Sequence, residues 1–162
     1  FKAELSNGSV MDIGIYTIYP MIALFGKPQK VEAQGVLLHT GVDGQGCANF
    51  KYEGMDATVL FSKIANSFLP TEIEGEEGNL VMNQIHIPTS LEYIPRVATE
   101  ENPRRQIGHP LEKSPYYYEI KEFIDLVNEG RKQSDVNTWE ISLATMEVID
   151  EIIENITISF VH

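Results

Sequence analysis

The sequence has little of several things that specialised proteins need. It contains one cysteine, Cys47, so an internal disulfide is excluded and nothing points to an oxidising compartment. We therefore expect a cytoplasmic protein. Basic residues are also scarce, since 12 Lys and Arg stand against 24 Asp and Glu, for a net charge of -12. Nucleic acids and anionic membrane surfaces are bound through clustered Lys and Arg, so we expect neither as a partner.

Long apolar runs and ligand-site signatures are missing as well. No apolar run approaches the roughly 20 residues of a membrane span. There is no GxGxxG phosphate-binding turn, because Gly41, Gly44 and Gly46 lie between predicted strands with no helix to follow them. The four histidines show no metal-binding spacing with one another or with the cysteine. We expect neither a metal site nor a complete dinucleotide site in this chain.

What is present is typical of one globular domain. The chain has 162 residues, of which 43% are hydrophobic and 22% charged, enough to bury a core. We therefore predict a single domain over residues 1–162. The chain begins with Phe1 and enters a helical segment almost at once, so we interpret it as a fragment of a longer two-domain protein.

The first segment reads as a helix that starts near Ser9 and stops at Gly26. We expect Ser9 to be the N-cap, with Asp12 three residues later in the manner of a capping box. Pro20 should kink this helix, because its ring clashes with the carbonyl four residues back. The helical period is carried by apolar residues at three- and four-residue steps, namely Met11, Ile15, Ile18, Ile22 and Phe25.

The middle of the chain alternates with a period of two, which indicates strands. The predicted strands are Lys30 to His39, Cys47 to Glu53, Ala57 to Ala65, Thr71 to Glu74, Leu80 to Met82 and Ile85 to Tyr93. Their connections are too short for crossover helices, so neighbouring strands should pair antiparallel. Such a sheet can pack one face on a core and leave the other free.

The last third predicts a loop and two helices. We expect a loop from Arg96 to Glu112, then a helix from Ser114-Pro115 to Glu129 that ends at Gly130. Asn137 or Thr138 should cap a final helix, whose predicted buried side is Ile141, Met146, Ile149, Ile152 and Ile153. The predicted fold class is α+β, with an open, largely antiparallel β-sheet and helices packed on one face.

The candidate site is an acid and a phenol on the first helix. Asp12 and Tyr16 are four residues apart, so both side chains should lie on one helical face as a proton-handling pair. Asp12 could instead serve only as a helix cap, and Tyr16 as a half-buried aromatic. Tyr19 is a packing residue or a substrate contact.

Other polar and aromatic groups have simpler explanations. Tyr116, Tyr117 and Tyr118 start a helix and are expected to form a packing cluster. Arg104 and Arg105 could meet an anionic substrate, but solvated loop charges are the commoner case.

The first segment resembles the start of the C-terminal domain in the glucose–fructose oxidoreductase / inositol dehydrogenase (Gfo/Idh/MocA) family. The residues that carry this resemblance are Gly8-Ser9-Val10-Met11-Asp12-Ile13-Gly14-Ile15-Tyr16, followed by Met21 to Pro28. The turn at Glu76-Glu77-Gly78, the helix opening at Tyr118-Glu119 and the helix from Trp139 to Ile156 extend it over nearly the whole chain. The family's common Gly-Gly is Asn7-Gly8 here.

The resemblance implies a substrate-binding and oligomerisation domain with a dihydrodipicolinate reductase-like C-terminal fold. Its partners would be its own N-terminal Rossmann domain, absent from this chain, a small-molecule substrate, and further copies joined through the β-sheet. NAD or NADP would be bound mainly by the Rossmann domain, so the fragment alone should be inactive. The implied substrate is a sugar, polyol or related hydroxy compound.

The resemblance also implies roles for the pair. Asp12 matches the family's substrate-side acid, and Tyr16 matches a position that is His or Tyr in different members. Their chemistry would be acid–base work at the substrate oxygen while hydride moves to or from nicotinamide. A tyrosine used in this way near neutral pH needs a nearby cation, which the lysine of the absent domain would supply.

Two alternatives remain open. The chain could be a non-catalytic assembly module that dimerises through its open sheet face, with Asp12 only a cap. It could also be a self-contained binder of a small ligand on that face.

Overall fold

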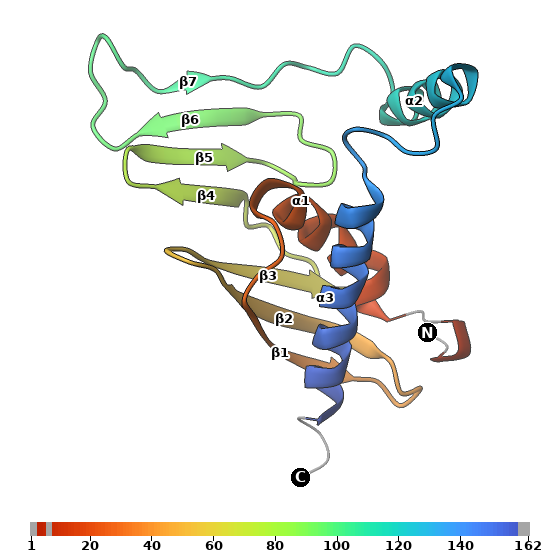
Figure 1. The fold of residues 1–162 in the computed structure, drawn as a ribbon. Helices are drawn as coiled ribbons and strands as arrows, with labels where there is room; N and C mark the ends of the chain where they lie inside the picture. The colour runs from red at the N-terminus through yellow and green to blue at the C-terminus, as the bar shows by residue number, and fades with distance from the viewer. Residues whose placement is uncertain (1–2, 6–7, 159–162) are drawn as a thin grey trace. The chain divides into compact units, whose positions relative to one another are not determined.

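The computed structural model describes residues 3–5 and 8–158, which belong to two compact units (Figure 1). The first unit is formed by residues from 1–66 and 135–162, and the second by residues 67–134. Each unit is built around its own antiparallel sheet. The expectation of one domain over residues 1–162 stays a prediction.

The first unit combines a three-stranded sheet with two long helices. Its elements are η1 (Ala3–Leu5), η2 (Val10–Gly14), α1 (Ile15–Phe25), β1 (Lys30–Leu37), β2 (Asp43–Lys51), β3 (Asp56–Ser62) and α3 (Trp139–Ile158). The strands lie in the order β1-β2-β3 and pair antiparallel. Cross-strand rows such as Ala33–Ala48–Val59 fix which side chains share a face.

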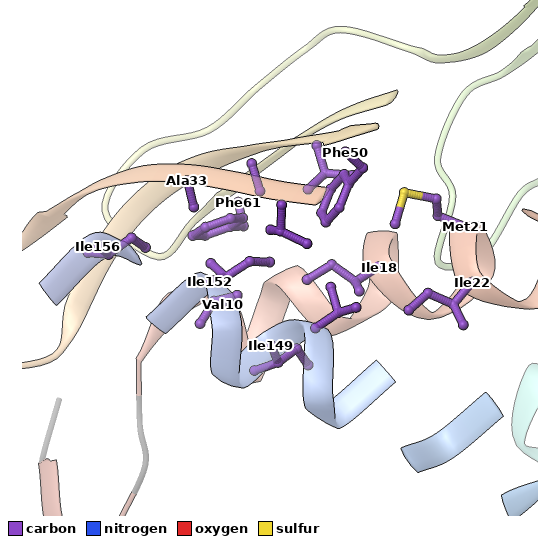
Figure 2. Close-up of a cluster of buried hydrophobic side chains, with 14 of the residues drawn as sticks. Val10, Ile18, Met21, Ile22, Ala33, Phe50, Phe61, Ile149, Ile152 and Ile156 are labelled. Atoms are coloured by element: carbon purple, nitrogen blue, oxygen red, sulfur yellow. The ribbon is translucent and has the colours of Figure 1, made fainter. Parts of the chain in front are cut away.

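One face of this sheet carries the core. The inward residues of the strands alternate with exposed ones, as a period of two requires. Figure 2 shows side chains of α1 and α3 meeting the strand residues in one cluster. Its labelled members are Val10, Ile18, Met21, Ile22, Ala33, Phe50, Phe61, Ile149, Ile152 and Ile156. Both long helices of this unit therefore pack on a single face of the sheet, as expected.

The second unit holds a four-stranded sheet and one helix. Its elements are β4 (Thr71–Gly75), β5 (Gly78–Met82), β6 (Leu91–Pro95), β7 (Arg105–Gln106) and α2 (Pro115–Glu129). The strands lie in sequence order, each antiparallel to the next. The helix begins with Pro115 and ends at Gly130, whose φ of 69° is left-handed and suits glycine.

The α+β class and the antiparallel pairing are confirmed, and so are the ends of two helices. The backbone N–H of Gly26, with φ of 77°, donates to the carbonyl of Ile22 and closes α1. Pro20 lies inside α1, which runs on to Phe25, and a kink there stays a prediction. Thr138 is the cap of α3, because its hydroxyl accepts from the N–H of Ile141 at 3.2 Å.

Several boundaries differ from the prediction. The strands form two sheets where we expected one, and β2 begins at Asp43 instead of Cys47. The predicted strand from Ile85 is wrong over 85–90, because the side chain of Asn83 accepts hydrogen bonds from the N–H groups of Thr89 and Ser90 and folds the chain there. The short β7 lies within the segment that we predicted as a loop.

The buried side of α3 is also partly different. Ile149 and Ile152 are fully buried as expected, whereas Met146 and Ile153 are each 37% exposed. Val148 and Ile156 take core positions that the prediction did not include. The apolar stripe is wider than one face of the helix, so hydrophobicity alone did not decide which side chains point inward.

Candidate active site

Asp12 and Tyr16 lie at the start of the first long helical segment. Asp12 belongs to η2, a π-helical turn in which the N–H of Ile15 donates to the carbonyl of Val10, five residues back. Tyr16 follows in the first turn of α1. The Asp12 side chain is 54% exposed and Tyr16 is 55% exposed. Both groups are therefore accessible, and single π-helical turns occur frequently at functional sites.

The carboxylate of Asp12 has a cationic partner that the sequence did not reveal. The Nζ of Lys63 lies 2.7 Å from Oδ2 of Asp12. Lys63 directly follows β3, and its side chain is only 19% exposed. No local spacing could have linked these two residues, because the contact depends on how β3 lies beside η2.

The helix begins differently from the expected capping box. Ser9 has helical angles, φ of -69° and ψ of -41°, and its side chain makes no capping hydrogen bond. The buried carboxylate of Asp43 takes the role instead, since its Oδ2 accepts from the N–H of Val10 at 2.7 Å. The predicted capping by the Ser9 side chain is therefore wrong, although Ser9 precedes the first turn, and the acid that satisfies the helix start comes from β2.

Gly8 makes room for this carboxylate. A Cβ built on Gly8 would lie 2.0 Å from Oδ1 of Asp43, so any other residue there would have to displace the carboxylate or the chain. The close approach of Asp43 to the chain therefore favours glycine at this position. This gives a physical reason for one of the two residues in the Asn7-Gly8 pair, and Asn7 lies outside the described residues.

Tyr19 is held by Asn137, which lies just before α3 begins. Its hydroxyl donates to Oδ1 of Asn137 at 3.0 Å, and that same oxygen accepts from the hydroxyl of Ser142 at 3.1 Å. Burial raises the pKa of Tyr19 above the ordinary value for tyrosine. This arrangement ties α1 to the start of α3, and a substrate contact by Tyr19 stays a prediction.

The two loop arginines are engaged within the second unit. Arg104 forms two hydrogen bonds with the carboxylate of Glu92, at 2.5 and 2.6 Å, and these lower the pKa of Glu92. The guanidinium of Arg105 lies 4.6 Å from the ring centroid of Tyr93 and donates to Oδ1 of Asn102. Neither arrangement needs an anionic ligand.

The remaining features of the described residues show no further chemistry at this site. The rings of Tyr117 and Tyr118 meet edge to face, with their centroids 5.5 Å apart.

Residues 3–5 and 8–158 contain no cluster of three or more metal-ligating side chains. Within that same part of the chain, no helix is long and apolar enough to cross a membrane. A pocket on the first sheet is lined by residues such as Lys30, Asn49 and Met55 and does not include the Asp12 and Tyr16 pair.

Comparisons with a family model and with known proteins place the chain in one family. A model of the GFO/IDH/MocA C-terminal domain matches residues 1–81. The chain is 44% identical over 151 residues to scyllo-inositol 2-dehydrogenase (NADP(+)) IolU of Bacillus subtilis (strain 168), covering 93% of this chain and 45% of that protein. It is 30% identical over 158 residues to trans-1,2-dihydrobenzene-1,2-diol dehydrogenase of Danio rerio, covering 93% and 46%.

A solved structure gives the same picture of the fold. The chain matches a mutant 3-ketoreductase from Actinomadura kijaniata, solved with TDP-benzene and NADP, at a TM-score of 0.70 and 20% identity, covering 92% of this chain and 48% of that one. The chain spans about half the length of the curated relatives that it matches. By its sequence match and its fold, this chain belongs to the Gfo/Idh/MocA oxidoreductase family, as a C-terminal domain.

Proposed function

We propose that this chain is the substrate-side domain of an NAD(P)-dependent oxidoreductase that acts on a polyol, sugar or related hydroxy compound. The observation that carries the proposal is the exposed Asp12, one turn before the exposed Tyr16, at the start of the first helix. The similarity to an NADP-dependent inositol dehydrogenase supports the same substrate class. We also propose a cytoplasmic location, since the single cysteine gives no sign of an oxidising compartment.

The cofactor phosphates would be held outside this chain. Within the described residues, β1, β2 and β3 are joined by turns, so no glycine-rich loop passes from a strand into a helix there. The residues present therefore fit the substrate side of the reaction and not the phosphate-binding side. NAD or NADP, bound mainly by the rest of the polypeptide, would supply the hydride acceptor or donor.

The roles of the pair follow from the reaction. Oxidation of a secondary alcohol removes a hydride from carbon and a proton from oxygen. We assign the proton to Tyr16, which as a phenolate would take it from the substrate hydroxyl and as the phenol would return it in the reverse direction. Asp12 would accept a hydrogen bond from the substrate and fix the orientation of that hydroxyl.

The test uses the full-length protein that contains this chain, with scyllo-inositol and NADP+ or NAD+ as probes. We expect Asp12→Asn and Tyr16→Phe each to lower kcat/KM by about 100-fold or more, the usual scale for loss of a positioned acid–base group. Asp56→Asn is the matched control, because Asp56 is an exposed acid at the start of β3 in the same unit. Wild-type kcat/KM in both site variants would disprove the assignment. Tyr19→Phe tests the substrate contact separately, through KM.

A second proposal concerns assembly. The outward residues of the first sheet are exposed and mostly polar, including Glu32, Asn49 and Thr58, but Val36 and Leu60 are 44% and 55% exposed. We propose that this face joins two copies of the protein, whether or not the chain is catalytic. Sedimentation of the full-length protein should show an oligomer that Leu60→Lys dissociates. A wild-type monomer would exclude this role.

A further inference from the structure

We propose that Lys63 is a positioning residue for Asp12 and supplies a cation to that carboxylate from within this chain. The inference rests on the proposed function of Asp12. The starting observation is the ion pair of 2.7 Å between the Lys63 ammonium and Oδ2 of Asp12. The sequence predicted no cationic partner for Asp12, so this ion pair changes what the chain itself contributes to the site.

The backbone of Lys63 is fixed at the end of the first sheet. Its N–H donates to the carbonyl of Gly44 at 2.9 Å and extends the pairing of β3 with β2 by one residue. Directly before it, the hydroxyl of Ser62 accepts from the N–H groups of Ile64 and Ala65 at 3.2 and 2.8 Å and turns the chain. The Lys63 side chain therefore starts from a defined position.

The helix that carries Asp12 is anchored at the neighbouring residue of β2. The side chain of Asp43 accepts a hydrogen bond from the N–H of Val10. The next residue, Gly44, accepts the hydrogen bond from the N–H of Lys63 through its carbonyl. The dipeptide Asp43-Gly44 thus fixes both the turn that carries Asp12 and the strand end that carries Lys63. Anchoring on one dipeptide favours a defined separation between the two groups.

The exposure of the two partners is unequal in the way a positioning role requires. The Lys63 side chain is 19% exposed, whereas Asp12 keeps 54% of its side-chain surface open for another ligand. The ion pair of Lys27 with Glu147 is similar in length, 2.6 Å, but its side chains are 50% and 61% exposed. An exposed pair of that kind contributes little, because solvent screens it and both side chains stay mobile.

The consequence concerns the geometry of the carboxylate. With Lys63 in place, one oxygen of Asp12 is held by the ammonium, and the carboxylate keeps one orientation toward a substrate hydroxyl. Without Lys63, Asp12 can rotate among its solvent-exposed rotamers, and the productive orientation becomes one of several. Loss of the productive orientation of a catalytic group in this way lowers the rate by about 10- to 100-fold.

The experiment is a double-mutant cycle in the full-length protein, with scyllo-inositol and NADP+ as probes. We expect Lys63→Gln to lower kcat by about 10- to 100-fold with a smaller change in KM, and Lys63→Arg to restore most of the loss, because it keeps the charge. In the Asp12→Asn background, Lys63→Gln should change kcat by less than about twofold, since its target is already removed. Lys27→Gln is the matched control and should keep wild-type kcat.

Each contrary result has a defined meaning. The positioning role is overturned if Lys63→Gln has no effect, if its effect is the same with and without the Asp12 carboxylate, or if circular dichroism shows that the variant has lost its fold to the same extent as its rate. In all three cases Asp12→Asn can still be impaired, so the proposed function stands. Wild-type kcat in Asp12→Asn instead removes the proposed function, and the Lys63 inference with it.

Discussion

The carboxylate of Asp43 offers the sharpest test of how the fold supports the site. Asp43→Ala removes a buried acceptor, 7% exposed, that receives the N–H of Val10 at 2.7 Å. A hydrogen bond to a charged group contributes about 1.5–3 kcal/mol, and a negative charge at a helix N-terminus adds about 0.3–1 kcal/mol. Removing a buried charge also returns part of its desolvation cost. We therefore expect a net loss of about 2 kcal/mol in the free energy of unfolding.

The assay is urea unfolding followed by circular dichroism, with the free energy taken by linear extrapolation. Asp43→Asn keeps an acceptor oxygen of the same shape and should lose only about 1 kcal/mol. Asp56→Ala removes an exposed acid from β3 and should change the free energy by less than about 0.5 kcal/mol. An Asp43→Ala loss as small as that of Asp56→Ala would show that the Asp43 carboxylate does not stabilise the helix start.

Gly8 provides an independent check on the same contact. In the wild type, Gly8→Ala would place a Cβ 2.0 Å from Oδ1 of Asp43 and must displace the carboxylate or the chain. In the Asp43→Ala background the obstructing oxygen is gone, so Gly8→Ala should cost much less. For two contacting residues, the loss in the double variant should differ from the sum of the single losses by about 0.5–3 kcal/mol. Additive losses would show that the two residues do not act on each other.

Three further predictions concern stability in the same unfolding assay. Gly46→Ala should lower the free energy of unfolding by about 1–3 kcal/mol, because its Cβ would lie 2.6 Å from the Phe61 ring and 2.7 Å from a backbone oxygen. An unchanged urea midpoint would contradict this packing. Ile152→Ala should cost about 2–5 kcal/mol, since the side chain is fully buried between helix and sheet; a loss under about 1 kcal/mol would argue against that burial. Burial raises the pKa of Tyr52, whose hydroxyl donates to the carbonyl of Gly26 at 3.0 Å. A raised pKa in the folded state gives stability that is present below about pH 10 and is lost as the pH rises further, because the unfolded chain ionises first. Tyr52→Phe should therefore show a smaller alkaline loss than the wild type, and an equal loss would exclude this cause.

Much of the fold could be predicted from the sequence because its signals are local. Gly26 and Gly130 end helices with a positive φ, and Pro115 starts one, so those boundaries depend only on nearby residues. The antiparallel pairing followed from short connections. The strand prediction was wrong where a side chain reorganised the backbone. In the segment before β6, the Asn83 side chain accepts hydrogen bonds from the backbone and replaces the alternating strand pattern with a turn.

The site was predictable only in part, for a related reason. Asp12 and Tyr16 are close in sequence and share a helix start, so their spacing was informative. Asp43 and Lys63 reach the same helix from β2 and from the end of β3, across long separations in the chain. Neither contact has a spacing or a composition that could have indicated it. Ser9 was the better local candidate for the cap, and a tertiary contact replaced it.

The most direct test of the central claim is the rate of the chemical step when Asp12 is neutralised. In a single turnover of the full-length protein with scyllo-inositol and NADP+, we expect Asp12→Asn to slow NADPH formation by about 100-fold or more. Binding of scyllo-inositol should change much less, and Asp56→Asn should behave as the wild type. A wild-type rate of NADPH formation in Asp12→Asn would show that the Asp12 carboxylate has no role in the chemical step.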